Sequence, residues 1–170
     1  MKGYRIVLLT LLFAVMCSMH ALAQKGDISP QDAAKVDKAW RAFLGGLQKR
    51  DTAQLRSMSL PRIECVPCQD RIQGRLEYRV GLDTFLTHLN SWPPDRWNAI
   101  MTRKYWVNTI VTSHTPPGII DTRKHFLIYE LAFVTTEPNV VAPGHEGVSH
   151  LFQFIDIDGT LRFYGMATVP

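Results

Sequence analysis

The chain has 170 residues, of which 46% are hydrophobic and 20% are charged, and its formal net charge at pH 7 is +4. A chain of this length suits one domain with a single hydrophobic core. Its basic residues are scattered among acidic and apolar residues, which is typical of a solvated surface and argues against a nucleic-acid partner.

Residues 1–23 have the pattern of a secretory signal peptide. Two basic residues precede an apolar run over 6–16, and the small-x-small sequence at 21–23 is typical of a cleavage site. The apolar run is shorter than the roughly 20 residues that a membrane-spanning helix needs, and an uncleaved anchor is the alternative. We therefore expect a secreted or periplasmic protein whose mature part, residues 24–170, is a single domain with no membrane attachment.

The first element predicted in the mature part is a helix that begins at Pro30. Ser29 is a typical N-cap residue, proline fits the first helical position, and apolar residues recur every three or four positions over 33–47. The Gly45-Gly46 pair weakens the last turns and permits another element to pack closely there. A second, short helix is predicted over 51–58.

Cys65 and Cys68 are the two cysteines outside the signal sequence. In an oxidising compartment such a pair forms a disulfide, which would rigidify one turn. The alternatives are a redox-active dithiol and a metal site. The neighbouring carboxylate of Glu64 raises rather than lowers a thiol pKa, and zinc needs two further ligands. We predict a structural disulfide and no metal.

The second half of the chain is rich in strand-forming residues. A short amphipathic helix is predicted over 81–89, and the prolines within 91–96 indicate a loop. β-Branched and aromatic residues then predict four strands, over 104–113, 125–135, 148–157 and 160–169.

Asp158-Gly159 is a strong hairpin signal between the last two of these strands. If residue 157 lies opposite residue 160, the register pairs Phe154 with Phe163, Gln153 with Tyr164 and His150 with Ala167. Helices followed by antiparallel strands predict an α+β fold. In this fold the N-terminal helices pack on a curved antiparallel sheet of about four to six strands that forms a cone with a cavity.

Two segments of the sequence carry a resemblance to a known family, namely Ala39–Leu44 with Lys49–Leu55, and the closing hairpin Phe152–Phe163. Together with the order of elements, they resemble the NTF2-like superfamily (cystatin-like cone, SnoaL and ketosteroid-isomerase-like), in particular its secreted bacterial members. The resemblance implies that the sheet and the first helix enclose an apolar cavity. Members range from isomerases and dehydratases to binding or assembly domains, so the resemblance leaves the function open.

The same resemblance implies where a catalytic site would lie. Members that catalyse use a carboxylate or histidine base inside the cone, with tyrosine or acid donors opposite. The candidates here are Glu130 and His150 as bases, Tyr129 and Tyr164 as donors, and Asp156 as a further acid. Glu130 has apolar neighbours on its own strand face, where an unpaired carboxylate is costly to bury. The alternative places Glu130 on the outward face of the sheet.

Aromatic residues are the candidates for a ligand pocket, although ordinary core packing is the alternative for each of them. The residues expected to line the pocket are Trp40, Phe43, Trp106, Phe126 and Phe154. We expect a non-catalytic module without a cofactor that binds a small apolar ligand or a protein partner, with a homodimer through the sheet face as one form of partner. The alternative is a cofactor-free isomerase or dehydratase that uses a carboxylate or histidine base.

Overall fold

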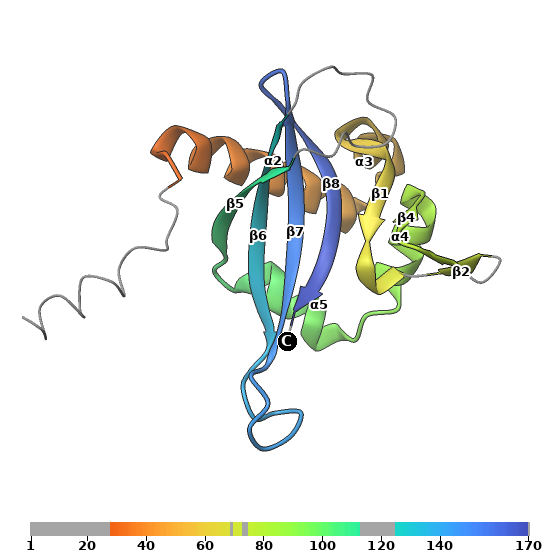
Figure 1. The fold of residues 1–170 in the computed structure, drawn as a ribbon, viewed down its shortest axis with the longest axis vertical. Helices are drawn as coiled ribbons and strands as arrows, with labels where there is room; N and C mark the ends of the chain where they lie inside the picture. The colour runs from red at the N-terminus through yellow and green to blue at the C-terminus, as the bar shows by residue number, and fades with distance from the viewer. Residues whose placement is uncertain (1–27, 69, 73–74, 113–124, 170) are drawn as a thin grey trace, which may run out of the picture.

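The computed structural model describes residues 28–68, 70–72, 75–112 and 125–169. The predicted signal peptide and its cleavage site lie outside these residues. Within them, four helices pack against a curved six-stranded sheet that does not close into a barrel (Figure 1), which confirms the predicted α+β class. None of the described helices is long and apolar enough to span a bilayer.

The long helix α2, Pro30–Lys49, begins as the sequence predicts. The Ser29 hydroxyl accepts a hydrogen bond from the Asp32 backbone N–H at 3.1 Å. The short helix α3, Thr52–Met58, follows after a tight turn, and the Asp51 carboxylate caps it by accepting from the Gln54 N–H at 2.9 Å. Both helices therefore start at side-chain caps that can be recognised from local sequence.

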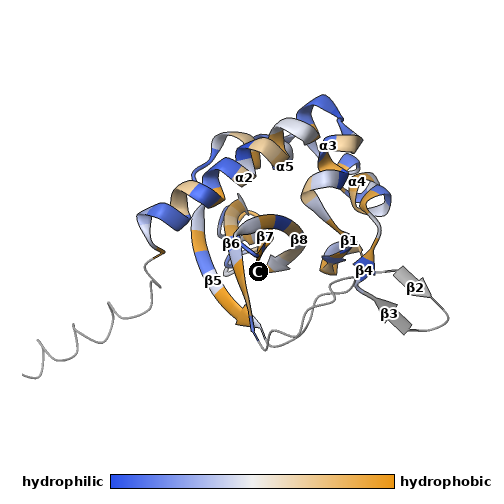
Figure 2. Cartoon of the chain, turned by 90° about the horizontal axis from the view of Figure 1, so that it is seen from above, coloured by the Kyte–Doolittle hydropathy of each residue, from blue (hydrophilic) through white to orange (hydrophobic). Residues whose placement is uncertain are grey.

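Two further helices follow one another, α4 over Leu82–Asn90 and α5 over Pro94–Thr102. The prediction of a loop over 91–96 is wrong in its second half, because α5 begins there. Pro94 occupies the first helical position, where the missing N–H is not needed. Seen from above, α2, α3 and α5 lie on one side of the strands (Figure 2).

The main sheet has the strand order β4-β1-β8-β7-β6-β5. Its strands are β1 (Ser59–Cys65), β4 (Arg79–Val80), β5 (Trp106–Thr112), β6 (Phe126–Thr136), β7 (Val148–Ile157) and β8 (Thr160–Val169). A 3-10 turn η1 (Val66–Cys68) and a separate hairpin of β2 (Asp70–Ile72) and β3 (Arg75–Glu77) follow β1. The sheet is mixed rather than purely antiparallel, because β1 pairs in parallel with β8.

The closing hairpin follows the predicted register only near its turn. Ile157 pairs with Thr160 and Phe154 with Phe163, as expected from the Asp-Gly signal. The register then shifts by one residue, so that Gln153 pairs with Gly165 and His150 with Thr168. The predicted pairs of Gln153 with Tyr164 and of His150 with Ala167 are therefore wrong, because a β-bulge inserts an extra residue on β8.

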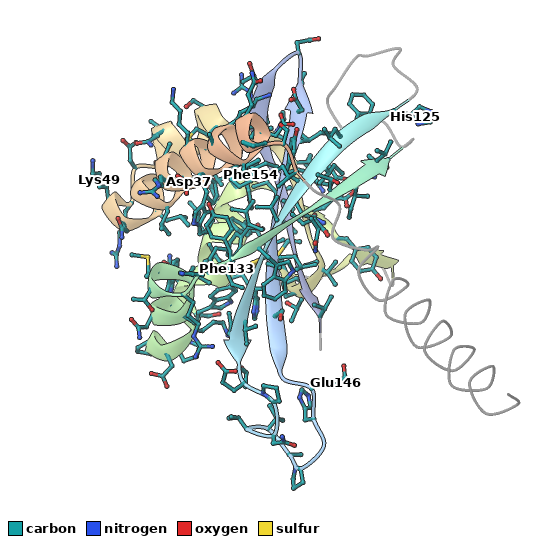
Figure 3. The ribbon with its side chains drawn as sticks, turned by 90° about the vertical axis from the view of Figure 1, so that its left-hand side faces the viewer. Asp37, Lys49, His125, Phe133, Glu146 and Phe154 are labelled. Atoms are coloured by element: carbon teal, nitrogen blue, oxygen red, sulfur yellow. A yellow bond between two sulfur atoms is a disulfide. The ribbon has the colours of Figure 1, made fainter. Side chains whose placement is uncertain are left out.

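Aromatic side chains of α2 pack against aromatic side chains of the sheet. The Trp40 ring lies 5.0 Å from that of Phe152 and 5.1 Å from that of Phe133, and Phe43 stacks on Phe163 at 4.2 Å. Figure 3 shows Phe133 between the helices and the strands. We call this side of the sheet the helix face. On the opposite face a smaller apolar cluster forms from Leu60, Phe126, Ile128, Ile155 and Tyr164.

A substitution at Gly165 tests the close contact between β1 and β8. A Cβ atom at this position would collide with the Glu64 carbonyl oxygen on β1, so Gly165→Ala must push the two strands apart. We expect the free energy of unfolding, measured by urea titration, to fall by about 2 kcal/mol.

The matched control is Gly45→Ala on α2, where an added Cβ meets no atom within 4 Å. Alanine is the better helix former, so this variant should be more stable by up to about 1 kcal/mol. Equal effects of the two substitutions would contradict the close approach of β1 to β8.

Candidate functional site

A concave region in the described part of the chain lies between the C-terminal end of α2 and the helices α4 and α5. It consists of two adjoining pockets with volumes of about 480 and 280 Å³. Both pockets are lined by Leu47, Arg50, Asn90 and Trp97. We refer to the two pockets together as the helical groove. It lies at the end of the helical layer and not between α2 and the sheet.

The floor of the helical groove is apolar and well supported. Leu47 of α2 and Leu86 of α4 line it and also pack against the main hydrophobic core. The indole N–H of Trp97 donates to the Leu89 carbonyl at 3.1 Å, which fixes that ring at the boundary of both pockets. A floor anchored in this way keeps its shape when no ligand is bound.

The rim of the groove is polar and carries two charged residues. Arg50 lines both pockets and is exposed, and no ion pair joins it to another residue within the described ranges. Asp83 lines the smaller pocket, but its carboxylate already pairs with Arg56 at 3.2 Å. Asn90 adds an amide to the wall that the two pockets share. The free charge at the rim is therefore positive.

Trp92 connects the groove to a cluster of buried and half-buried side chains. Trp92 lines the larger pocket, and its ring meets His150 edge-on with centroids 4.5 Å apart. The indole N–H of Trp92 donates to Nε2 of His88 at 3.2 Å, so this nitrogen must be unprotonated. The Arg96 guanidinium lies 5.1 Å from the centre of the Trp92 ring.

His150 is buried in a neutral state. Its side chain is 2% exposed, and Nδ1 lies 2.8 Å from the Thr135 hydroxyl. That hydroxyl donates to the Val148 carbonyl, so Nδ1 carries the hydrogen and donates to Thr135. Burial, with smaller contributions from Arg96 and His88, lowers the pKa of His150 to about 4.

The sheet separates the predicted catalytic residues into two groups. Glu130 and Tyr164 lie on the opposite face, where the Glu130 carboxylate accepts a hydrogen bond from Gln153 at 2.7 Å. Burial and the nearby Glu64 carboxylate raise the pKa of Tyr164 well above its usual value. An acid or base on this face cannot reach a substrate bound on the helix face.

Tyr129 and His150 share the helix face but do not meet. Tyr129 pairs with Phe154 and His150 with Phe133, so they are separated by four residues along the strands, or roughly 13 Å. Burial, together with the Asp32 carboxylate, raises the pKa of Tyr129 to about 12. Neither residue lines the helical groove.

Asp156, the remaining candidate acid, is already engaged in a structural contact. Its carboxylate forms an ion pair with Lys35 of α2 at 2.5 Å and accepts a hydrogen bond from the Gly159 backbone N–H at 2.8 Å. Both contacts lie near the end of β7, away from the residues that line the helical groove. Asp156 therefore joins α2 to the hairpin and lies outside the candidate site.

The five residues predicted to line a ligand pocket do not lie in one place. Trp40, Phe43 and Phe154 belong to the packed rings between α2 and the sheet. Phe126 lies on the opposite face, and so does Trp106, which pairs with Ala132 at the edge of the sheet. Figure 3 shows Phe154 between α2 and the strands. None of the five lines the helical groove.

Sequence reasoning did not find the residues that line the groove, because they come from α2, α3, α4, α5 and the turn after α2. Leu47, Leu86 and Trp97 read as ordinary helix-face residues. One local signal was available at Arg50, which lies where one helix ends and the next begins, a position that glycine or asparagine usually occupies.

The Cys65–Cys68 disulfide is present as predicted. It joins the end of β1 to η1, and both cysteines belong to the main core. Across the described ranges, no group of three or more histidine, cysteine, aspartate or glutamate side chains is arranged to hold a metal ion.

Comparison with known proteins found no match among family models and none among curated proteins. The NTF2-like resemblance therefore stays a prediction based on element order and two short segments.

The buried His150 makes stability depend on pH. Its pKa is about 4 in the folded protein and about 6.5 in the unfolded chain, so the unfolded chain takes up a proton first as the pH falls. We expect the free energy of unfolding to decrease by about 2 to 3 kcal/mol between pH 6.5 and pH 4, as measured by urea titration across that range.

His150→Gln keeps a polar side chain that can reach Thr135 but does not titrate, so most of this pH-dependent loss should disappear. The control is His125→Gln at an exposed position, which should retain the full loss. Identical pH profiles for wild type and His150→Gln would show that His150 is not held neutral.

Proposed function

We propose that this protein is a non-catalytic binding domain of NTF2-like type, secreted or periplasmic, that holds a small apolar molecule in the helical groove. The observation that carries the proposal is the pair of adjoining pockets, of about 480 and 280 Å³, that share Leu47, Arg50, Asn90 and Trp97. Pockets of several hundred Å³ with an apolar floor and few polar groups are the usual form of small-molecule sites.

The apolar floor supplies the driving force for binding. Leucine and tryptophan side chains cover the base of the groove, and covering about 250 Å² of apolar ligand surface would contribute roughly 6 kcal/mol before the entropy of association is subtracted. This favours a ligand of modest size bound with micromolar to millimolar affinity.

The placement of the titratable groups favours binding over catalysis. A general acid or base must lie within hydrogen-bond reach of the substrate. Glu130 and Tyr164 lie on one side of the sheet, His150 and Tyr129 on the other, and none of the four lines the groove. The isomerase or dehydratase alternative would therefore need a substrate site away from the helical groove.

Filling the groove tests the proposal. Asn90 lies in the wall shared by both pockets, so Asn90→Trp should occupy the space and abolish binding of indole and 1-decanol, which we expect the wild type to bind. Binding is measured by isothermal titration calorimetry and by the ligand-induced rise in Tm.

The control places the same indole at Asn98, an exposed position on α5 outside the groove, and Asn98→Trp should bind both probes as the wild type does. Equal binding by both variants would place the ligand elsewhere. A wild type that binds neither probe would exclude the proposed function.

A second candidate function is self-association through the edge strand β5, which ends the sheet (Figure 1). The strand contains neither a charged residue nor proline, the features with which proteins usually protect an edge. Val107, Thr109 and Val111 share one face of β5, and Val111 is 66% exposed. Antiparallel pairing about Thr109 would set valine opposite valine and threonine opposite threonine in a second copy.

We expect the protein to form a concentration-dependent dimer, measured by sedimentation velocity. Thr109→Lys would place two like charges opposite each other at the two-fold axis and should weaken the dimer. Thr84→Lys, at an exposed position on α4, adds the same charge elsewhere and should leave the dimer unchanged. A wild type that stays monomeric at every concentration would contradict pairing through β5.

A further inference from the structure

We infer that the ligand of the helical groove is an amphipathic carboxylic acid, with its carboxylate on Arg50 and its apolar part over the leucine and tryptophan floor. The inference rests on the proposed function and specifies the chemical class of the ligand. It follows from the backbone at Arg50, from the charges at the rim, and from the position of this side chain in both pockets.

The backbone at Arg50 is unusual for an arginine. Its φ of 54° and ψ of 35° lie in the left-handed region. The Arg50 N–H donates to the Leu47 carbonyl at 3.2 Å and the Asp51 N–H to the Gly46 carbonyl at 2.9 Å. These two hydrogen bonds form a Schellman motif, in which the left-handed position is usually glycine because a Cβ is unfavourable there.

The fold itself does not explain an arginine at this position. A cation near the C-terminus of a helix interacts favourably with the helix dipole, but Lys49 in the last turn of α2 already provides one. The Arg50 guanidinium forms no ion pair within the described part of the chain. What the side chain does in the structure is line both pockets of the groove.

Arg50 determines the electrostatic character of the groove. Asp83 is the other charged lining residue, and Arg56 already neutralises it at 3.2 Å. One uncompensated guanidinium therefore faces an otherwise neutral, largely apolar site. A planar guanidinium binds a carboxylate through two parallel hydrogen bonds, and the Asn90 amide on the shared wall is a further donor.

The single positive charge favours a monoanion. A phosphate monoester carries a charge of about −1.5 to −2 at neutral pH and would need more than one cation. A carboxylate with an alkyl or aryl tail matches both the charge at Arg50 and the apolar floor.

The experiment compares two ligands that differ only in the head group, decanoate and 1-decanol, by isothermal titration calorimetry at pH 7. We expect the wild type to bind decanoate at least about tenfold more tightly than 1-decanol, as a charge-assisted bidentate contact would give. In Arg50→Gly this preference should disappear, so that the Kd for 1-decanol divided by the Kd for decanoate falls to about one. Its Tm should stay the same or rise, because glycine adopts the left-handed conformation freely.

The control is Lys49→Gln, which removes the neighbouring charge but not a lining residue, and the preference for decanoate should persist. If Arg50→Gly keeps the preference, or if Lys49→Gln loses it, the inference fails while the proposed function stands, since 1-decanol still binds the wild type. If the wild type binds neither compound, the proposed function fails and this inference with it.

Discussion

The packing of aromatic rings between α2 and the sheet determines where this protein can hold a ligand. Phe43 stacks on Phe163 at 4.2 Å, and Trp40 contacts both Phe133 and Phe152 at about 5 Å. The sequence predicts a ligand space between the first helix and the sheet, and these packed rings lie in that position. The long helix is thereby fixed on the strands, and its C-terminal end projects over α4 and α5, where the groove opens.

Close packing at the end of α2 completes the site. A Cβ on Gly46 would lie 2.9 Å from a methyl group of Leu55, so only glycine allows α3 to approach α2 this closely. The same turn holds Arg50 in its left-handed conformation and places this residue among those that line both pockets. Leu55 itself lines the smaller pocket. One short segment therefore determines the helix–helix contact, the shape of the groove and its charge.

The sequence correctly predicted those features that depend on interactions between residues close together in the chain. The Ser29 cap, the Asp158-Gly159 turn and the Cys65–Cys68 disulfide depend on residues close together in the chain, and each is present. The register beyond Phe154 could not be read locally, because the Asp-Gly turn signal does not show where a bulge interrupts the pairing of β7 with β8. The groove could not be predicted from local sequence either, because it forms only when α2, α4 and α5 pack together.

The face of the sheet on which Glu130 lies could not be predicted from the sequence alone. Because side chains alternate between the two faces of a strand, Glu130 shares a face of β6 with its apolar neighbours. Both faces of β6 are buried, however, so the hydrophobicity of the residues does not show which face packs against the helices. The pairing of β6 with β7 supplies the answer and places the carboxylate opposite Gln153, away from His150. His150 and Tyr129 share the helix face, whereas Glu130 and Tyr164 lie on the opposite face. None of these four residues lines the helical groove, which combines an apolar floor with an arginine at its rim.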